Sequence, residues 1–193
     1  YGGLATNPIH VLSKILSLLY DKNGRITLEG FYDDVPELSN EQKEQWESLN
    51  FDAKEFLSNV GLSNIIGEKD YSPLEKIWSR PTCEVNGIWG GYTEPGFKTV
   101  LPSEASAKVS FRLVGKQDPN KVLKSFRNHV SKNLPSDCKV EFLAKAGSGA
   151  SSLEINSPEV KAAEKALHDE WNVSPKMVAV SYTHLRAHET PTN

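Results

Sequence analysis

Residues 105–113 constrain the fold of this chain more than any other stretch, because apolar and polar side chains alternate there without a break. The apolar positions are Ala105, Ala107, Val109, Phe111 and Leu113, and the positions between them are Ser106, Lys108, Ser110 and Arg112. A period of two is the pattern of a β-strand with one buried face and one open face. The pattern therefore predicts a strand that places Arg112 on the open face of a sheet.

A Gly- and Pro-rich segment, residues 90–96, precedes this strand and predicts a loop. The loop delivers Lys98 and Thr99 to a corner marked by Pro102. A cation on an open sheet face, with a hydroxyl thirteen residues earlier on a loop, suits an anionic ligand. An arginine at a polar strand position is more often a solvated surface residue, and the residue pattern alone leaves that alternative open.

Signals for helices and strands on both sides of this stretch predict the fold class. Strands are expected at 25–28, 82–85, 88–89 and 138–143, with Asn86-Gly87 as a hairpin turn. Helices are expected to begin at the capping residues Asn7, Ser39, Asp52, Ser72, Asp118 and Ser157. This order predicts an α+β fold, a two-layer sandwich in which an antiparallel sheet carries helices on one face in a ferredoxin-like layout.

Two sequence segments resemble one enzyme family. Gly-Phe-Lys-Thr-Val-Leu-Pro at 96–102 and Ser-Phe-Arg-Leu-Val at 110–114 are similar to the dimerisation, or lid, domain of the co-catalytic zinc exopeptidases. That family includes carnosine dipeptidases, aminoacylases and succinyl-diaminopimelate desuccinylases, and the similarity is greatest to the dipeptidase branch. The resemblance implies a metallopeptidase that acts on dipeptides or short peptides and forms a homodimer through its lid domain. It also implies that Thr99 and Arg112 reach the active site, where the arginine binds the substrate carboxylate.

The resemblance further implies how the chain is divided and where the metals lie. Residues 1–150 would form the lid, with a helical insertion at about 36–80, and residues 151–180 would begin the returning catalytic domain. In the family two zinc ions are held by a catalytic domain whose ligand segments are absent from this sequence. We therefore expect no metal ligand and no catalytic residue in the chain, and no activity from the chain alone.

Residues 181–193 resemble translated sequencing adapter, and we expect this tail to be non-native. His184 and His188 stand four residues apart in it, as two zinc ligands on one helix face would. The His-Glu-x-x-His order of a metalloprotease is absent, which disfavours a metal site there. Asp33 and Asp34 also invite a metal interpretation, but adjacent residues on an extended chain point apart.

Composition excludes several other classes of protein. A net charge of -3 gives no electrostatic reason to expect binding to nucleic acid or to an anionic membrane, and no apolar run approaches a membrane span. Cys83 and Cys138 have no closely spaced partner, so we expect reduced thiols and a cytoplasmic protein.

The remaining alternative is a stand-alone ferredoxin-like module that binds a ligand or RNA. RNA binding would need aromatic residues on the open face, whereas Phe111 is predicted to point inward.

Overall fold

The computed structural model describes residues 1–143, 145 and 147–179. The chain forms two compact units. The first, which we call the sheet unit, comprises Tyr1–Val35, Gly67–Lys69 and Pro81–Ala150. The second, the helical unit, comprises Pro36–Ile66, Asp70–Arg80 and Ser151–Asn193.

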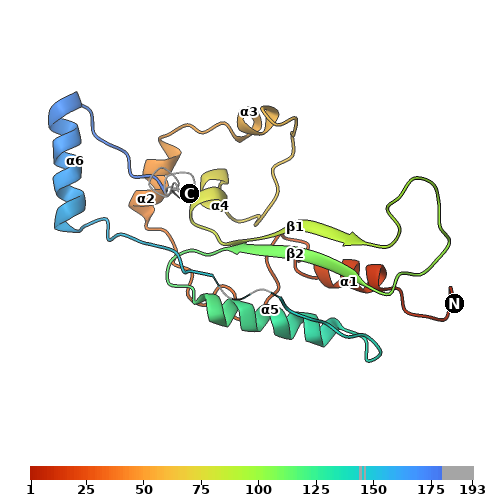
Figure 1. Cartoon of the computed structure of the whole chain (residues 1–193). Helices are drawn as coiled ribbons and strands as arrows, with labels where there is room; N and C mark the ends of the chain where they lie inside the picture. The colour runs from red at the N-terminus through yellow and green to blue at the C-terminus, as the bar shows by residue number, and fades with distance from the viewer. Residues whose placement is uncertain (144, 146, 180–193) are drawn as a thin grey trace, which may run out of the picture. The chain divides into compact units, whose positions relative to one another are not determined.

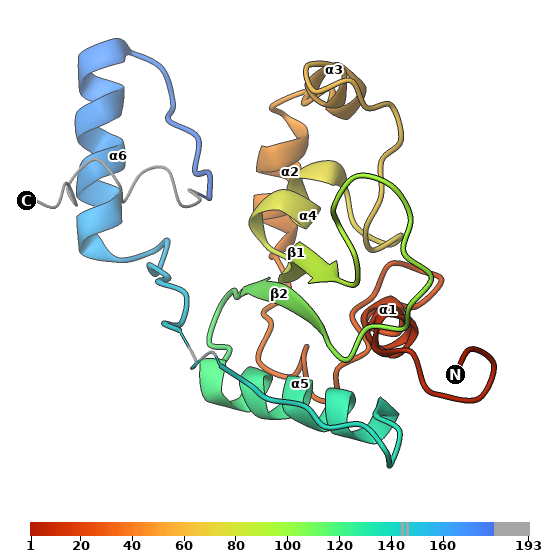
Figure 2. The ribbon, with the colours of Figure 1, turned by 45° about the vertical axis from the view of Figure 1, so that its right-hand side comes forward.

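The sheet unit has one antiparallel sheet and two helices (Figure 1). Strand β1 (Thr82–Gly90) pairs with β2 (Ala105–Arg112), and helices α1 (Pro8–Ser17) and α5 (Pro119–Asn133) lie on the same side of the sheet (Figure 2). Each helix begins at a predicted cap, because a side-chain oxygen of Asn7 or Asp118 accepts a backbone N–H of the first turn. The predicted α+β class, an antiparallel sheet with helices on one face, is confirmed.

The alternation predicted for residues 105–112 is also confirmed. Val109 and Phe111 pack against the hydrophobic core, whereas Lys108, Ser110 and Arg112 are exposed. Burial of every second side chain fixes the rotation of the strand about its own axis, because a shift of one residue would expose the apolar set. The core therefore determines the direction in which Arg112 points.

The predicted hairpin turn at Asn86-Gly87 is wrong. Strand β1 continues through these residues, and its pairing passes from Val85↔Val109 directly to Gly87↔Lys108. Asn86 is thus an extra residue, which makes a β-bulge rather than a turn. A turn at this position would have separated Val85 from Val109, and the connection between the strands is made instead by the loop at 91–104.

Two of the other predicted strands do not form as expected among the described residues. At 25–28 the chain makes one isolated bridge, between Tyr20 and Ile26. Residues 138–143 form no strand, and Val140 is 40% exposed. Phe142 does contact the unit, with its ring centroid 6.4 Å from that of Phe126. The segment at 138–143 is therefore attached to the sheet unit by the aromatic contact of Phe142 and does not pair as a strand.

The hydrophobic core lies between the sheet and its helices. Its buried members are Leu19, Ile26, Leu28, Phe31, Cys83 and Val122. Phe31 is 2% exposed, and its ring centroid lies 6.0 Å from that of Phe111 and 5.3 Å from that of Tyr32. The Gln117 side chain donates to the Phe31 carbonyl oxygen at 2.6 Å, so the backbone of this core residue is also satisfied.

The two cysteines are unpaired and differ in burial. Burial of Cys83 raises the pKa of its thiol to about 12, and the Tyr20 hydroxyl donates to the Cys83 carbonyl oxygen. Desolvation likewise raises the pKa of Tyr20 above its ordinary value. Between pH 9 and 12 the Cys83 thiol stays protonated in the folded state, whereas a thiol with the ordinary pKa of 9.0 ionises in the unfolded state. The stability that this group contributes therefore falls as pH rises from 9 towards 12. Both groups are neutral at pH 7 and serve packing.

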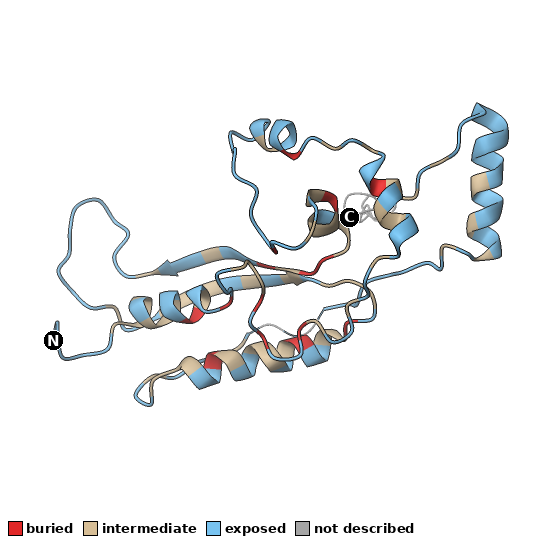
Figure 3. Ribbon diagram, turned by 180° about the vertical axis from the view of Figure 1, so that it is seen from behind, coloured by how far each residue is buried: buried red, intermediate tan, exposed pale blue. Residues whose placement is uncertain are grey.

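The helical unit contains α2 (Asn40–Glu47), α3 (Ala53–Ser58), α4 (Pro73–Trp78) and α6 (Pro158–Trp171). The capping boxes predicted at Ser39 and Ser72 are both complete. Asp52 caps α3 by accepting two backbone N–H groups, but the returning bond of a capping box is not formed there. No described residue of α6 is fully buried (Figure 3), although Val160 is half-buried.

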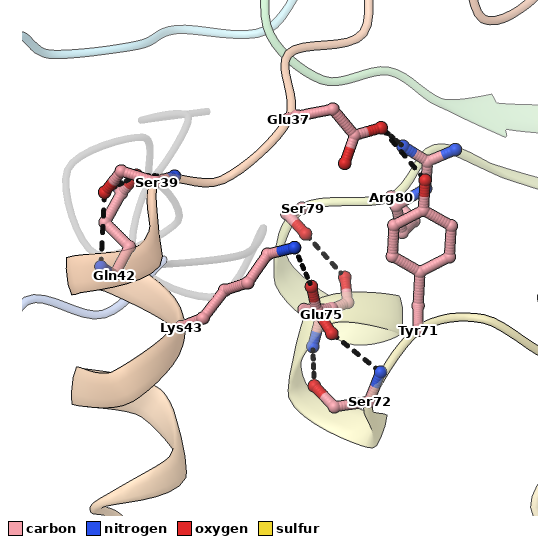
Figure 4. Close-up of polar contacts among 9 residues, drawn as sticks. All are labelled: Glu37, Ser39, Gln42, Lys43, Tyr71, Ser72, Glu75, Ser79 and Arg80. Carbon is pink, nitrogen blue, oxygen red and sulfur yellow. Dashed lines mark hydrogen bonds and ion pairs between the residues drawn. The ribbon is translucent and has the colours of Figure 1, made fainter.

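Polar contacts join α2 and α4 (Figure 4). The Lys43 ammonium lies 3.7 Å from the Glu75 carboxylate, which also accepts from the Ser72 backbone N–H. After α4, Arg80 is only 5% exposed, and its guanidinium pairs with Glu37 at 3.6 Å and covers the Tyr71 ring at 4.0 Å. These contacts stabilise the helical unit, and they bring no catalytic combination of side chains together.

Candidate functional site

Arg112 is the last residue of β2, and it lies opposite Thr82 in the ladder. Its side chain is on the face of the sheet away from the core, because the preceding residue, Phe111, packs into the core. The structure therefore places Arg112 on the open face, as the alternation predicted.

Several polar side chains share this open face with Arg112. Glu84 lies opposite Ser110, one pair along the ladder from Thr82 and Arg112. Farther along, the Lys108 ammonium lies 5.8 Å from the centroid of the Trp89 ring. The bulge brings Trp89 to the open face, opposite Ser106. The open face thus carries one carboxylate, Glu84, between two cations.

Sequence reasoning missed Glu84 as a member of this site. The signal was present, because Glu84 follows Cys83 and the buried residue fixes its neighbour on the other face. Its pairing with Ser110, and hence its place beside Arg112, follows only from the register of the two strands. The incorrect hairpin at Asn86-Gly87 gave a different register and hid the relation.

Thr99, the other predicted site residue, is not brought close to Arg112. It lies in the exposed loop at 91–104, which leaves β1 at Gly90 and enters β2 at Ala105. Arg112 is at the opposite end of β2, about 23 Å from Ala105 at roughly 3.3 Å per residue. A ligand the size of a dipeptide that binds Arg112 is too short to reach the loop end of the same strand.

The loop end has its own shallow hollow, with a volume of about 490 Å³. Its lining includes Trp89, Tyr92, Lys98, Glu104 and Ser106. The Lys98 ammonium lies 5.8 Å from the centroid of the Tyr92 ring. One cation, one carboxylate and two aromatic rings line the hollow, and its lining brings together no nucleophile and general base.

The described residues include no group of three or more His, Cys, Asp or Glu side chains that could hold a metal ion. Asp34 pairs with Lys121 at 3.3 Å, and a His129 ring nitrogen lies 3.1 Å from the Ile15 carbonyl oxygen. His184 and His188 lie outside the described residues. The described part of the chain therefore does not fit a zinc site.

Comparisons with known proteins give a consistent result. The family model described as "Peptidase dimerisation domain" matches residues 1–138. Among curated proteins, the chain is 28% identical over 181 residues to the Beta-Ala-His dipeptidase of Rattus norvegicus, covering 92% of this chain and 37% of that protein. It is 29% identical over 180 residues to the Cys-Gly metallodipeptidase of Candida albicans, covering 91% of this chain and 37% of that protein.

Two solved structures are similar over most of the chain. An M20 family metallo-carboxypeptidase from Sulfolobus solfataricus has 36% identity and a TM-score of 0.76, with 92% of this chain and 40% of that chain covered. Human carnosine dipeptidase 1 has 26% identity and a TM-score of 0.73, with 95% and 40% covered. The chain therefore spans about 37% of the length of the curated relatives that it matches.

Proposed function

Because the chain belongs to the family of the peptidase dimerisation domain, whose model it matches over residues 1–138, we propose that it is part of a metal-dependent hydrolase of dipeptides or short peptides. The observation that carries this proposal is the similarity over more than nine-tenths of the chain to proteins named as dipeptidases. The proposed division assigns residues 1–150 to the lid, with an insertion at about 36–80, and 151–180 to the returning catalytic domain. A cytoplasmic location is proposed from the unpaired cysteines.

In this proposal Arg112 binds the C-terminal carboxylate of the substrate. A guanidinium is planar and can donate two parallel hydrogen bonds to the two carboxylate oxygens, whereas an ammonium offers a point charge. The position of Arg112 on the open sheet face, away from the core, supports the assignment. Thr99 is proposed to help hold the scissile group.

The proposed cofactor is a pair of zinc ions, held by residues of the full-length protein outside this chain. Bound zinc polarises a carbonyl and lowers the pKa of a bound water. The described residues of this chain do not fit such a site, and their proposed part is to bind substrate.

Metal removal tests the proposed function. The full-length protein that contains this chain should contain two zinc ions per subunit and hydrolyse dipeptides. Chelation should abolish hydrolysis and added zinc should restore it, whereas this chain alone should hydrolyse nothing. Undiminished dipeptide hydrolysis after complete removal of metal would contradict the proposal.

We further propose a homodimer formed through the lid. The family description supports association. The antiparallel sheet of the sheet unit also has two edges that pair with no further strand among the described residues. The full-length protein should sediment as a dimer at micromolar concentration. A protein that remains monomeric up to tens of micromolar, while it hydrolyses dipeptides at full rate, would contradict the proposed dimer.

The alternative of a stand-alone RNA-binding module is not favoured. RNA-binding sheets of this layout stack two or three bases on aromatic side chains. Here the open face has the single aromatic ring of Trp89 among the residues of β1 and β2, because Phe111 packs into the core.

No helix among the described residues has the length and apolar character needed to cross a membrane.

A further inference from the structure

Glu84 and Arg112 are neighbours across the open face. Thr82 lies opposite Arg112 and Glu84 lies opposite Ser110, so Glu84 and Arg112 occupy diagonal positions on adjacent strands. Diagonal neighbours on one sheet face are about 7–8 Å apart, which long side chains can bridge. A ligand bound to Arg112 therefore lies within reach of the Glu84 carboxylate.

The charge of Glu84 is not committed to another described residue. It forms no ion pair or hydrogen bond with a described side chain, and it is exposed. The other cation that β2 places on this face, Lys108, has its ammonium 5.8 Å from the centroid of the Trp89 ring, towards the loop end of the sheet. Among the residues of β1 and β2, Glu84 is thus the carboxylate that lies on this face beside Arg112.

The chemistry of a dipeptide determines what Glu84 contacts. The side chain of the C-terminal residue branches from the carbon that carries the carboxylate. When Arg112 holds the carboxylate, that side chain must lie among the immediate neighbours of Arg112 on the sheet face. A lysine or arginine side chain is long enough to bring its positive charge to Glu84, whereas an aspartate or glutamate side chain brings a like charge.

We propose that Glu84 sets the preference of the enzyme for the charge of the C-terminal substrate residue, favouring basic residues and disfavouring acidic ones. This inference rests on the proposed function, in which Arg112 binds the substrate carboxylate. Opposite charges at this spacing in a partly solvated site change the relative kcat/KM of two substrates by about tenfold.

The test compares Glu84→Gln with the unchanged full-length protein on three dipeptides, Ala-Lys, Ala-Gln and Ala-Glu. Glu84→Gln should lower kcat/KM for Ala-Lys, raise it for Ala-Glu and leave Ala-Gln nearly constant, so that the Lys-to-Glu preference falls about tenfold. Glu29→Gln is the matched control, because Glu29 is also an exposed carboxylate. Its backbone carbonyl oxygen accepts a hydrogen bond from the Ser125 hydroxyl of α5, which lies on the helix side of the sheet. Glu29→Gln should change none of the three values.

The outcomes separate this inference from the proposed function. If Glu84→Gln changes kcat/KM equally for all three dipeptides, Glu84 positions Arg112 or supports the fold, and the inference is overturned while the proposed function stands. If the unchanged protein hydrolyses no dipeptide, the proposed function fails first. Thermal melting of each variant identifies loss of folding, and Glu84→Asp, which retains the charge, should keep most of the Lys-to-Glu preference.

Discussion

Replacing Arg112 by alanine in the full-length protein should lower kcat/KM for dipeptides by roughly thirty-fold to several thousand-fold. Removal of one partner from a charge-assisted pair in a closed site costs on the order of 2–5 kcal/mol, because the other charge is left unpaired. Arg112→Lys should recover only part of this loss, since an ammonium cannot donate the two parallel hydrogen bonds of a guanidinium. Steady-state kinetics on a free dipeptide measures the effect.

The control for this experiment is Lys108→Ala. Lys108 is a cation on the same open face, but its ammonium lies over Trp89, so its loss should change kcat/KM little. The decisive comparison is between a free dipeptide and its C-terminal amide. If Arg112→Ala lowers kcat/KM for both equally while the protein stays folded, Arg112 does not bind the carboxylate.

Replacing Phe31 by alanine should lower the free energy of unfolding of the chain by about 3–5 kcal/mol. Phe31 is 2% exposed and its ring packs against Phe111 and Tyr32, so the substitution leaves a cavity at the centre of the sheet unit. Denaturant titration followed by circular dichroism measures the change. Phe111 would lose a packing partner, and we expect the strand that carries Arg112 to be the element most affected.

Phe97→Ala is the matched control for this stability prediction. Phe97 is the same residue type, but it is fully exposed in the loop at 91–104, so its removal creates no cavity. Its substitution should change the free energy of unfolding by less than about 0.5 kcal/mol. Equal losses for Phe31→Ala and Phe97→Ala would contradict the prediction that burial of the Phe31 ring stabilises the chain.

The elements that could be predicted from sequence are those fixed by local rules. Side-chain caps at Asn7, Ser39 and Ser72 begin helices where predicted, because a cap satisfies backbone groups within its own first turn. Alternation in 105–112 correctly gave the face on which Arg112 lies, because burial of Phe111 decides it.

The features that could not be predicted depend on distant partners. Asn86-Gly87 is a common turn sequence, yet here a bulge is formed, because Cys83 and Val85 pair with Phe111 and Val109. Residues 138–143 alternate like a strand, but alternation does not supply a neighbouring strand to bond with. The position of Glu84 beside Arg112, and the separation of Thr99 from Arg112, both required the register between β1 and β2.

The bulge at Asn86 also limits how far a change in the loop reaches along the hairpin. It takes up one residue inside β1, so Cys83 and Phe111 pair in the core at one end although the pairing towards the loop is shifted by one residue. We expect a change in the length of the loop at 91–104 to leave Glu84 and Arg112 on their face. The loop end and the charged end of the hairpin are therefore structurally separate.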